Sequence, residues 1–580
     1  MNDFLNIYRL FKTQIRIIVF CSILVALLEV LGLAVLVPVL PLIISSTDGI
    51  VEFEVLDVTY SLSMLTTLIL LPLLFFTKNI IVIMARYINN KMVFSIKSDA
   101  ECMMMNYYLN CSVADITLES PNKVTNNIVA EIQIFTFNFL QAAVVILTEL
   151  FVASILLSAL IYYDFQMFLM LIIPLVIVMA PMLIVTSKMQ SEVGQDNRVA
   201  NEGMLGEIEV ALGAFREIRI YSLYDYIFSR FQDKSRQVAD TFTKSQSIAM
   251  AGFPIVESIL VGVLFGFLYY LIGIIKLPSN EIILVVSIYG FVALRALPGI
   301  SRIATSINQV KFGHRTIRQI IDVGKYTRDK DHDKASNYRG AEKLKRLQIA
   351  GLGFSYPKSA SVFNDVNVII PASSRVGLIG ESGSGKSTLV DILIGLQAPS
   401  AGKVIYHVGN SEYSPNEFLP KIGYVPQDVY VINGSLANNI ALGVLPQDID
   451  HDYISLLCRL LLLDKILQGK CPSDVLLNAR STDISGGQRA RIGLARALYR
   501  KPEVLILDEI TSSLDSETSK IVLKHMFDLL TDGAITIMNA HKLEDLETFD
   551  KVYRVKECDI VLGDMSEIRS ERRLSPPVGP

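Results

Sequence analysis

Long apolar stretches in the first half of the chain constrain its fold more than any other feature. A helix needs about 20 apolar residues to cross the hydrocarbon layer of a membrane. Six stretches reach this length, and they lie at 17–44, 62–84, 136–162, 166–187, 247–275 and 282–305. We therefore predict an all-α transmembrane domain with six spans and long cytoplasmic extensions in residues 1–323.

The second stretch is the least regular of the six, because Lys78 and Asn79 interrupt it. A shorter buried segment is the alternative interpretation for this stretch. The predicted number of spans depends on this choice.

Basic residues predict the orientation of the spans, because Lys and Arg gather in the cytoplasmic loops of membrane proteins. Arg9, Lys12 and Arg16 precede the first stretch, and the 187–246 connection carries eight more basic residues. Residues 45–60 carry none. We therefore expect a multi-pass protein of the cell inner (cytoplasmic) membrane, with both termini on the cytoplasmic side.

Composition agrees with a membrane protein. Hydrophobic residues make up 51% of the chain and charged residues 19%, and the net charge is −4. A nucleic-acid-binding function is excluded for want of a basic excess. The six cysteines show no metal-ligand spacing, which favours a reduced compartment without disulfides.

Polarity rises sharply after residue 323. Residues 324–346 are polar and highly charged, and we predict a linker there. Residues 347–570 have the pattern of a soluble α/β domain, and we predict a disordered tail at 571–580. The second half of the chain should therefore fold as a separate domain.

A glycine-rich motif in this second half predicts a nucleotide site, because residues 380–387 fit G-x-x-x-x-G-K-[ST]. The apolar residues 376–379 before the motif predict a strand, and a helix should begin at Lys386. Backbone N–H groups of such a loop bind phosphates, the lysine adds a positive charge, and the Ser387 hydroxyl can ligate Mg²⁺. We predict ATP and Mg²⁺ as ligands of Gly380, Glu381, Ser382, Gly383, Ser384, Gly385, Lys386, Ser387 and Thr388.

Two acids follow another apolar run, residues 504–507. A buried parallel strand ends in this way when its carboxyl end faces a ligand. Asp508 would then hold Mg²⁺ through water, and Glu509 would be the general base that polarises the attacking water. The alternative is that the two acids cap a helix at Thr511.

A further motif lies just ahead of this strand, the run Asp483-Ile484-Ser485-Gly486-Gly487-Gln488-Arg489, which we name the signature run. With the glycine-rich loop before it and the two acids after it, this order resembles the ATP-binding cassette (ABC) proteins. The resemblance implies an α/β P-loop NTPase domain of ABC type at 347–570. It also implies an ATP hydrolase whose activity is coupled to transport.

The resemblance implies roles for other residues. Tyr356 would stack on adenine, Gln427 would contact Mg²⁺ and the attacking water, and His541 would contact the γ-phosphate. Asp515 would lie at the interface between two cassettes.

Each motif occurs once in the chain, and this implies a partner. In ABC proteins the signature run of one cassette completes the ATP site of another. A chain with a single cassette therefore pairs, most simply as a twofold homodimer. The residues concerned are Ser485, Gly486, Gly487 and Gln488.

The two long cytoplasmic connections, 85–135 and 187–246, resemble those of exporter-type ABC transporters. The resemblance places coupling helices at 112–120 and 219–228, with ordinary solvated helical hairpins as the alternative. Exporters often carry a Gly-Glu pair just before the signature run, where this chain has Ala479.

Cations inside the predicted spans point to the substrate, because charges there are costly and mark function. Arg295 and Arg302 share one face of the sixth span, and Lys78 could reach the same cavity from the second. Such a cluster suits an anionic substrate. The alternative is a set of internal ion pairs that fix helix register, for example Glu29 with Lys78.

Short segments at 27–32 and 292–302 resemble the bacterial flippases of lipid-linked oligosaccharides. The resemblance implies a membrane lipid bearing a glycan as substrate, with Lys78, Arg295 and Arg302 at its pyrophosphate. An exporter of peptides or hydrophobic small molecules is the alternative. A nucleotide-gated channel or sensor is a further one.

Overall fold

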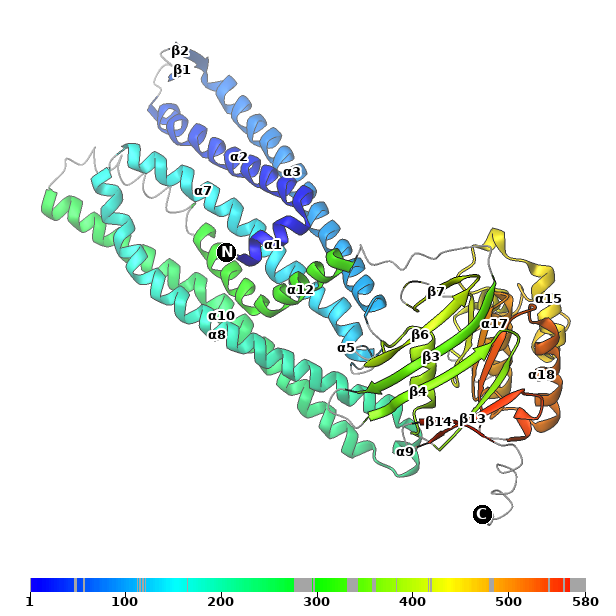
Figure 1. Ribbon diagram of the computed structural model, residues 1–580. Helices are drawn as coiled ribbons and strands as arrows, with labels where there is room; N and C mark the ends of the chain where they lie inside the picture. Colours follow the sequence, from blue (N-terminus) through cyan, green and yellow to red (C-terminus); the bar gives the residue numbers. More distant parts are fainter. Residues whose placement is uncertain are drawn as a thin grey trace. The chain divides into compact units, whose positions relative to one another are not determined.

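Helices and a mixed α/β fold occupy different parts of the chain, as the sequence predicts. The computed structural model contains two units, Met1–Cys111 with Asp115–His332, and Ser112–Ala114 with Asp333–Pro580 (Figure 1). We refer to them as unit 1 and unit 2. The structure describes residues 2–45, 50–55, 58–111, 113, 116, 119, 121–163, 165–275, 295, 298–330, 343–356, 361–381, 383–415, 417, 420–478, 484–540, 543–556 and 559–563.

Unit 1 is built from long helices, because a helix satisfies its own backbone hydrogen bonds where no water is available. The α-helices are α1 (Asn2–Leu10), α2 (Lys12–Ser45), α3 (Met64–Leu109), α5 (Pro121–Asn126), α6 (Ile132–Ile134), α7 (Ala142–Tyr163), α8 (Phe165–Gly213), α9 (Phe215–Ile220), α10 (Tyr224–Tyr269) and α12 (His314–Lys330). Three π-helical segments adjoin them, η1 (Asn127–Glu131), η2 (Phe135–Gln141) and η3 (Tyr270–Ile275). Residues 298–312 are also helical.

Several helices of unit 1 are long and apolar enough to cross a membrane. Among the described residues these are Lys12–Gly32, Leu65–Leu109, Lys123–Tyr162 and Glu257–Ile274. They fall on the first, second, third and fifth predicted spans, so the predicted all-α region with membrane-length helices is confirmed. Lys78 and Asn79 lie within the uninterrupted helix α3.

The other two predicted spans are only partly described. The fourth, 166–187, is helical as part of α8. In the sixth, 282–305, residues 282–294 and 296–297 lie outside the described residues, and 298–305 are helical. The number six therefore stays a prediction.

The connection between the first two spans contains an antiparallel hairpin that the sequence analysis missed. Its strands are β1 (Ile50–Val55) and β2 (Val58–Ser63). Ser63 then caps α3, because its hydroxyl accepts a hydrogen bond from the Thr66 N–H at 3.3 Å.

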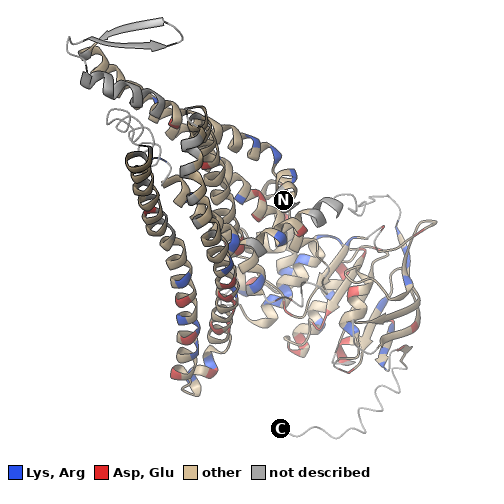
Figure 2. Cartoon of the chain, turned by 90° about the vertical axis from the view of Figure 1, so that its left-hand side faces the viewer, with Lys and Arg blue, Asp and Glu red and all other residues tan. Residues whose placement is uncertain are grey.

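Helices α8 and α10 form a long antiparallel pair, and the 49 residues of α8 extend about 74 Å at about 1.5 Å per residue. Figure 2 shows charged residues concentrated along the half of this pair that leads to the connection between the two helices. Buried polar contacts join the helices there, from Gln190 to Ser245 (Nε2 to Oγ, 2.6 Å) and from Asn197 to Thr241 (Nδ2 to Oγ1, 2.8 Å). Such contacts fix the register of the pair because each unpaired buried amide would be costly.

The range predicted as a linker, 324–346, contains regular structure at both ends. Helix α12 continues to Lys330, and strand β3 begins at Leu344. The helix continues because Ile317, Ile320 and Val323 bury one of its faces in unit 1. The predicted domain boundaries remain a proposal.

Unit 2 contains a six-stranded sheet in the order β14-β13-β5-β12-β11-β8, parallel except for β14. A second, antiparallel sheet has the order β4-β3-β6-β7. The bounds are β3 (Leu344–Ser355), β4 (Ser361–Pro371), β5 (Arg375–Ile379), β6 (Ala401–Val408), β7 (Ser411–Tyr413), β8 (Ile422–Val425), β11 (Val504–Asp508), β12 (Ile535–Asn539), β13 (Lys551–Lys556) and β14 (Asp559–Leu562). The predicted α/β P-loop fold is confirmed by these sheets.

Helices connect and cover the strands of unit 2. The longer ones are α13 (Lys386–Leu393), α15 (His451–Leu460), α17 (Gly486–Tyr499) and α18 (Ser516–Leu529), and the short ones are α14 (Leu436–Ile440) and α16 (Asp464–Leu467). A two-stranded ladder joins β9 (Gly434–Ser435) to β10 (Leu476–Leu477).

The first four residues of β11, 504–507, are apolar and buried, as expected of a strand that is covered on both faces. Leu505 and Leu507 lie in one hydrophobic cluster, and Val504 and Ile506 lie in another. This alternation is the period of two expected of a strand. The strand therefore holds the acids that follow it in a rigid position.

We predict that Gly194→Ala destabilises unit 1. A Cβ at this position of α8 would lie 2.8 Å from the carbonyl oxygen of Phe312, so the two helices would have to separate. Overpacking of this kind costs about 1–3 kcal/mol. The full chain in detergent should show a lower midpoint of thermal unfolding by circular dichroism.

Gly206→Ala in the same helix is the matched control, because nothing lies within 4 Å of its added Cβ. This variant should be neutral or more stable by up to about 1 kcal/mol. Equal midpoints for the two variants would contradict the predicted close approach.

Candidate functional site

The glycine-rich loop joins β5 to α13 in unit 2, with Ser382 outside the described residues. Gly385 has φ +100°, and a Cβ there would lie 2.6 Å from Cγ1 of Val362. A Cβ on Gly380 would lie 2.6 Å from the Val555 carbonyl oxygen. Only glycine fits both positions, so the loop backbone can approach a ligand closely.

Lys386 is buried in the first turn of α13 and folds back over the loop. Its Nζ donates to the carbonyl oxygens of Gly380 at 2.8 Å and Glu381 at 2.9 Å. The Ser384 hydroxyl is buried and has no hydrogen-bond partner among the described residues. A phosphate would suit this arrangement, because an anion at a helix N-terminus accepts hydrogen bonds from N–H, hydroxyl and ammonium groups.

The two acids lie at the carboxyl end of β11. Gln427 donates from Nε2 to Oε2 of Glu509 at 2.7 Å, and Asn539 donates from Nδ2 to Oδ1 of Asp508 at 2.8 Å. Glu509 has φ +53°, a conformation that a non-glycine residue adopts only at some cost. Its backbone N–H donates to the Asn539 carbonyl at 3.1 Å, which stabilises the turn.

Asn539 is a site residue that the sequence analysis did not assign. It ends β12, and the parallel register places it directly beside Asp508. The available signal was the apolar run that precedes it, which resembles the run before Asp508.

Asp391 and Tyr424 also surround Asp508. Burial, with Asp508 as a second cause, raises the pKa of the Asp391 carboxyl. Burial and the same carboxylate raise the pKa of Tyr424 to about 12. The Asp508 carboxylate therefore disfavours a further negative charge on Asp391 and Tyr424, and a cation bound beside it would relieve this repulsion.

The signature run begins helix α17. The Ser485 hydroxyl accepts from the backbone N–H of Gln488, and the Gln488 side chain accepts from the backbone N–H of Ser485 at 2.8 Å. This capping box fixes the start of the helix. Gly487 packs tightly, since an added Cβ would lie 2.9 Å from the Ser513 carbonyl oxygen. Gly486 has more room, because an added Cβ there would lie 3.5 Å from Cβ of Ser513.

The remaining predicted residues of unit 2 are distributed as follows. The Tyr356 hydroxyl lies 3.0 Å from Oγ1 of Thr388, which places this ring beside the first turn of α13. Asp515 caps α18 by accepting from the Thr518 N–H at 2.9 Å, and this bond lowers the pKa of its carboxyl. Ser387, the predicted Mg²⁺ ligand, is exposed. Gly383 lies in the glycine-rich loop with φ +82°. His541 and Ala479 lie outside the described residues.

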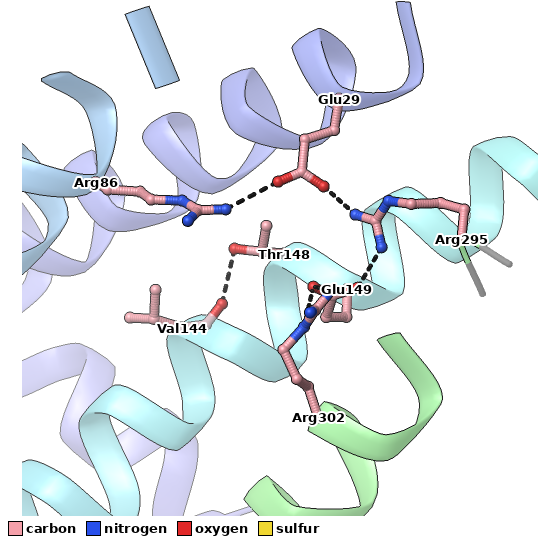
Figure 3. A network of polar contacts seen from close by, with 7 residues as sticks. All are labelled: Glu29, Arg86, Val144, Thr148, Glu149, Arg295 and Arg302. Atoms are coloured by element: carbon pink, nitrogen blue, oxygen red, sulfur yellow. Dashed lines mark hydrogen bonds and ion pairs between the residues drawn. The ribbon is translucent and has the colours of Figure 1, made fainter. Parts of the chain in front are cut away.

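In unit 1, the structure brings two of the three predicted cations together. Arg295 and Arg302 both contact Glu149 (Figure 3). The Nζ of Lys78 lies 4.8 Å from the centre of the Phe75 ring and beside Gly32 of α2, where an added Cβ would be 2.9 Å from it.

The alternative of internal ion pairs is therefore realised, but with other partners than the expected Glu29–Lys78 pair. Glu29 contacts Arg295 and Arg86, the latter at 2.9 Å. Arg86 was not among the predicted residues. It lies two helical turns after Lys78 on α3, and this spacing was the signal that could have identified it.

The two predicted coupling segments differ in how far they are described. Most of 112–120 lies outside the described residues. The second, 219–228, spans the end of α9 and the start of α10, where the aromatic side chains of Tyr221, Tyr224 and Phe228 are exposed. Its role in coupling stays a prediction.

Comparison with known proteins finds a family match within the second half of the chain. Residues 363–512 match the ABC transporter family. The chain is similar to an ATP-dependent lipid A-core flippase of Alcanivorax borkumensis, with 25% identity over 82% of this chain and 80% of the relative. A flippase of the same description from Methylococcus capsulatus is 27% identical over 64% of this chain and 61% of the relative.

A relative with a different description is also similar. The lactococcin-G-processing and transport ATP-binding protein LagD of Lactococcus lactis is 27% identical over 61% of this chain and 49% of the relative. The matched segments thus span from about half to four fifths of the lengths of these relatives.

We predict that Gly385→Ala weakens nucleotide binding by at least about tenfold. Its Cβ would collide with Val362 and would also strain a backbone with φ +100°, so the loop must move. Titration of the full chain with a fluorescent ATP analogue measures the effect.

Gly533→Ala provides the control for backbone strain alone. Gly533 has φ +95°, and nothing lies within 4 Å of its added Cβ. Nucleotide affinity should be unchanged in this variant. Unchanged affinity in Gly385→Ala would show that the loop geometry does not set binding.

Proposed function

Because this chain is an ABC transporter ATPase domain fused to an N-terminal membrane region, we propose that it is an exporter-type half-transporter that works as an ATP-driven flippase. The observation that carries the proposal is the presence of a complete phosphate loop and acid pair on a chain with membrane-length helices. ATP hydrolysis in unit 2 would drive movement of substrate by unit 1 through alternating access. The chain is a multi-pass membrane protein.

Each residue of the ATP site has a proposed role. Lys386 and the loop N–H groups would bind the β- and γ-phosphates, and Tyr356 would stack on adenine. Glu509 would accept a proton from the attacking water, and Gln427, which already contacts its carboxylate, would help to position that water. His541 would contact the γ-phosphate.

Mg²⁺ fits the oxygen donors at this site. The Ser387 hydroxyl, the Gln427 amide oxygen and the Asp508 carboxylate are ligands of the kind that Mg²⁺ prefers. Asn539 would hold the Asp508 carboxylate in place. When bound, the ion would neutralise charge on the phosphates.

A homodimer follows from the single copy of each motif. Ser485 and Gly486 are exposed at the start of α17, and the N-terminus of a helix suits a phosphate, here the γ-phosphate bound by a second copy. Ser485, Gly486 and Gly487 would make these contacts, and Asp515 would lie at the same interface. A different half-transporter in place of the second copy is the alternative.

The proposed substrate is an anionic lipid-linked oligosaccharide, moved from the cytoplasmic to the outer leaflet of the inner membrane. Two observations support it, the paired Arg295 and Arg302 in unit 1 and the description of two relatives as lipid A-core flippases. Lys78 would add a third cation. Both chain termini and the ATPase domain would be cytoplasmic, as the basic residues at 9–16 and 187–246 indicate.

A peptide exporter is the second candidate. The similarity to a lactococcin-G-processing and transport protein favours it. A nucleotide-gated channel or sensor is less well supported, because Glu509 and Gln427 are in contact as hydrolysis requires.

We predict that Glu509→Gln abolishes ATP turnover while ATP stays bound. The amide cannot accept the proton from water, so the variant should hold ATP in a closed dimer. Phosphate release and retention of radiolabelled ATP measure the two effects in the purified chain. Glu517→Gln, an exposed acid on α18, is the control and should hydrolyse ATP normally.

Undiminished ATPase activity in Glu509→Gln would contradict the assignment of the general base. Loss of ATP binding in the same variant would instead point to a structural role for this carboxylate.

We predict that polyprenyl-pyrophosphate glycans stimulate the ATPase activity of the chain reconstituted in liposomes. A transporter hydrolyses ATP faster when its substrate shifts the dimer toward the state in which the two ATPase domains are closed on each other. Peptides should stimulate less. A flat response to the lipid-linked glycan would remove this substrate, and a response to peptides alone would favour the second candidate.

A further inference from the structure

Five charged side chains form one connected network of ion pairs in unit 1. Arg86, Glu29, Arg295, Glu149 and Arg302 alternate in sign and contact one another in this order (Figure 3). Arg86 lies on α3, Glu29 on α2 and Glu149 on α7. Arg295 and Arg302 belong to the segment described at residues 295 and 298–312. Three guanidinium groups face two carboxylates, so the network carries a net charge of +1.

Glu149 is the most buried member of this network. Its side chain is 9% exposed, against 17% for Arg295 and 47% for Arg302. Oε1 of Glu149 accepts from Arg302 at 2.9 Å (Nε) and 2.8 Å (Nη2), whereas Oε2 lies 3.5 Å from Nη1 of Arg295. One carboxylate therefore contacts both of the cations proposed to bind substrate, closely at Arg302 and more loosely at Arg295, whose nearer partner is Glu29.

The chain makes room for this carboxylate at Gly299, which lies between the two arginines. A Cβ at this position would lie 2.6 Å from Oε2 of Glu149 and 3.7 Å from Nη1 of Arg295. No side chain larger than hydrogen fits unless the carboxylate moves. The absence of a side chain at Gly299 thus leaves the space that the end of the Glu149 side chain occupies.

We infer that Glu149 is a built-in counter-anion that competes with the anionic head group of the substrate for Arg302 and Arg295. This inference rests on the proposed anion site and names how that site is regulated. A carboxylate and a phosphate bind the same face of a guanidinium, so they cannot both occupy Nε and Nη2 of Arg302. A substrate phosphate that binds this edge of the guanidinium then requires that Arg302 leave Glu149.

The exchange has a physical reason. A guanidinium that is buried without an anion is costly, and the Arg295 side chain is only 17% exposed, so the empty site favours a carboxylate beside it. A counter-charge that leaves when substrate binds also prevents the site from holding its anion too tightly. Glu149 is therefore a positioning residue that limits affinity and speeds release.

The test measures binding of farnesyl pyrophosphate to the full chain in nanodiscs, with farnesol as the uncharged analogue. Glu149→Gln keeps the shape of the side chain and removes the competing charge. We expect it to lower the half-saturating concentration of farnesyl pyrophosphate by about tenfold, the size of a typical coupling between two ligands. The maximal rate of ATP hydrolysis stimulated by the probe should fall, because release becomes slower.

Arg302→Gln should have the opposite effect and weaken binding of the probe. In the double variant the gain from Glu149→Gln should shrink, because the two residues act through one contact. Glu101→Gln is the matched control, since it removes a part-buried carboxylate paired with Lys97 on the same chain. This control should bind the probe as the unchanged chain does.

Gly299→Ala tests the same idea without a change of charge. The added methyl group must displace Glu149, so this variant should also bind farnesyl pyrophosphate more tightly. Gly262→Ala is its control, because nothing lies within 4 Å of that Cβ. If Glu149→Gln fails to fold, Gly299→Ala carries the test alone.

The outcomes separate the inference from the proposed function. Weaker binding in Arg302→Gln with unchanged or weaker binding in both Glu149→Gln and Gly299→Ala would overturn the counter-anion and leave the anion site standing. Equal binding of farnesyl pyrophosphate and farnesol by the unchanged chain would remove the anion site, and the counter-anion with it. The inference would also be overturned if Glu149→Gln raised the affinity for farnesyl pyrophosphate by the same factor in the unchanged chain and in the Arg302→Gln variant.

Discussion

The parallel register of β5, β12, β11 and β8 is the constraint on which the ATP site depends. The carboxyl ends of parallel strands lie at one edge of a sheet, so the strand pairing alone brings together residues that are far apart in the sequence. Asp508 and Asn539 are neighbours for this reason, and Gln427 reaches Glu509 from the loop after β8. The same edge carries the glycine-rich loop, which follows β5.

Unit 1 obeys a different constraint, because charges placed among membrane-length helices need partners. Three arginines and two glutamates satisfy one another through contacts between helices that are distant in the sequence. The pairing holds α2, α3 and α7 to the segment after residue 294. It also means that the two predicted substrate cations already contact carboxylates of this chain, and a ligand that took their place would have to compete with them.

The positions of the glycine-rich loop and of the two acids were predictable because both motifs are local. The loop at residues 380–387 follows β5, and the acids Asp508 and Glu509 lie at the end of β11. Their roles in ATP hydrolysis stay a prediction. Asn539 escaped the sequence analysis since its role comes from its place beside Asp508 and from no motif of its own. The hairpin after α2 was missed because alternation over six residues is a weak signal next to the long apolar stretches.

The sequence by itself determined which half of the chain is apolar enough for a membrane and which half carries the ATPase motifs, and the single copy of each motif led to the prediction of a partner. These properties depend on composition and on residues that are close in the chain. Only the tertiary structure decided which charges neutralise one another, replacing the expected Glu29–Lys78 pair with Glu29–Arg86, Glu29–Arg295 and Glu149–Arg302. The rotation and register of the helices select these partners. Packing between helices sets both, as at Gly299, and a local sequence pattern does not reveal it.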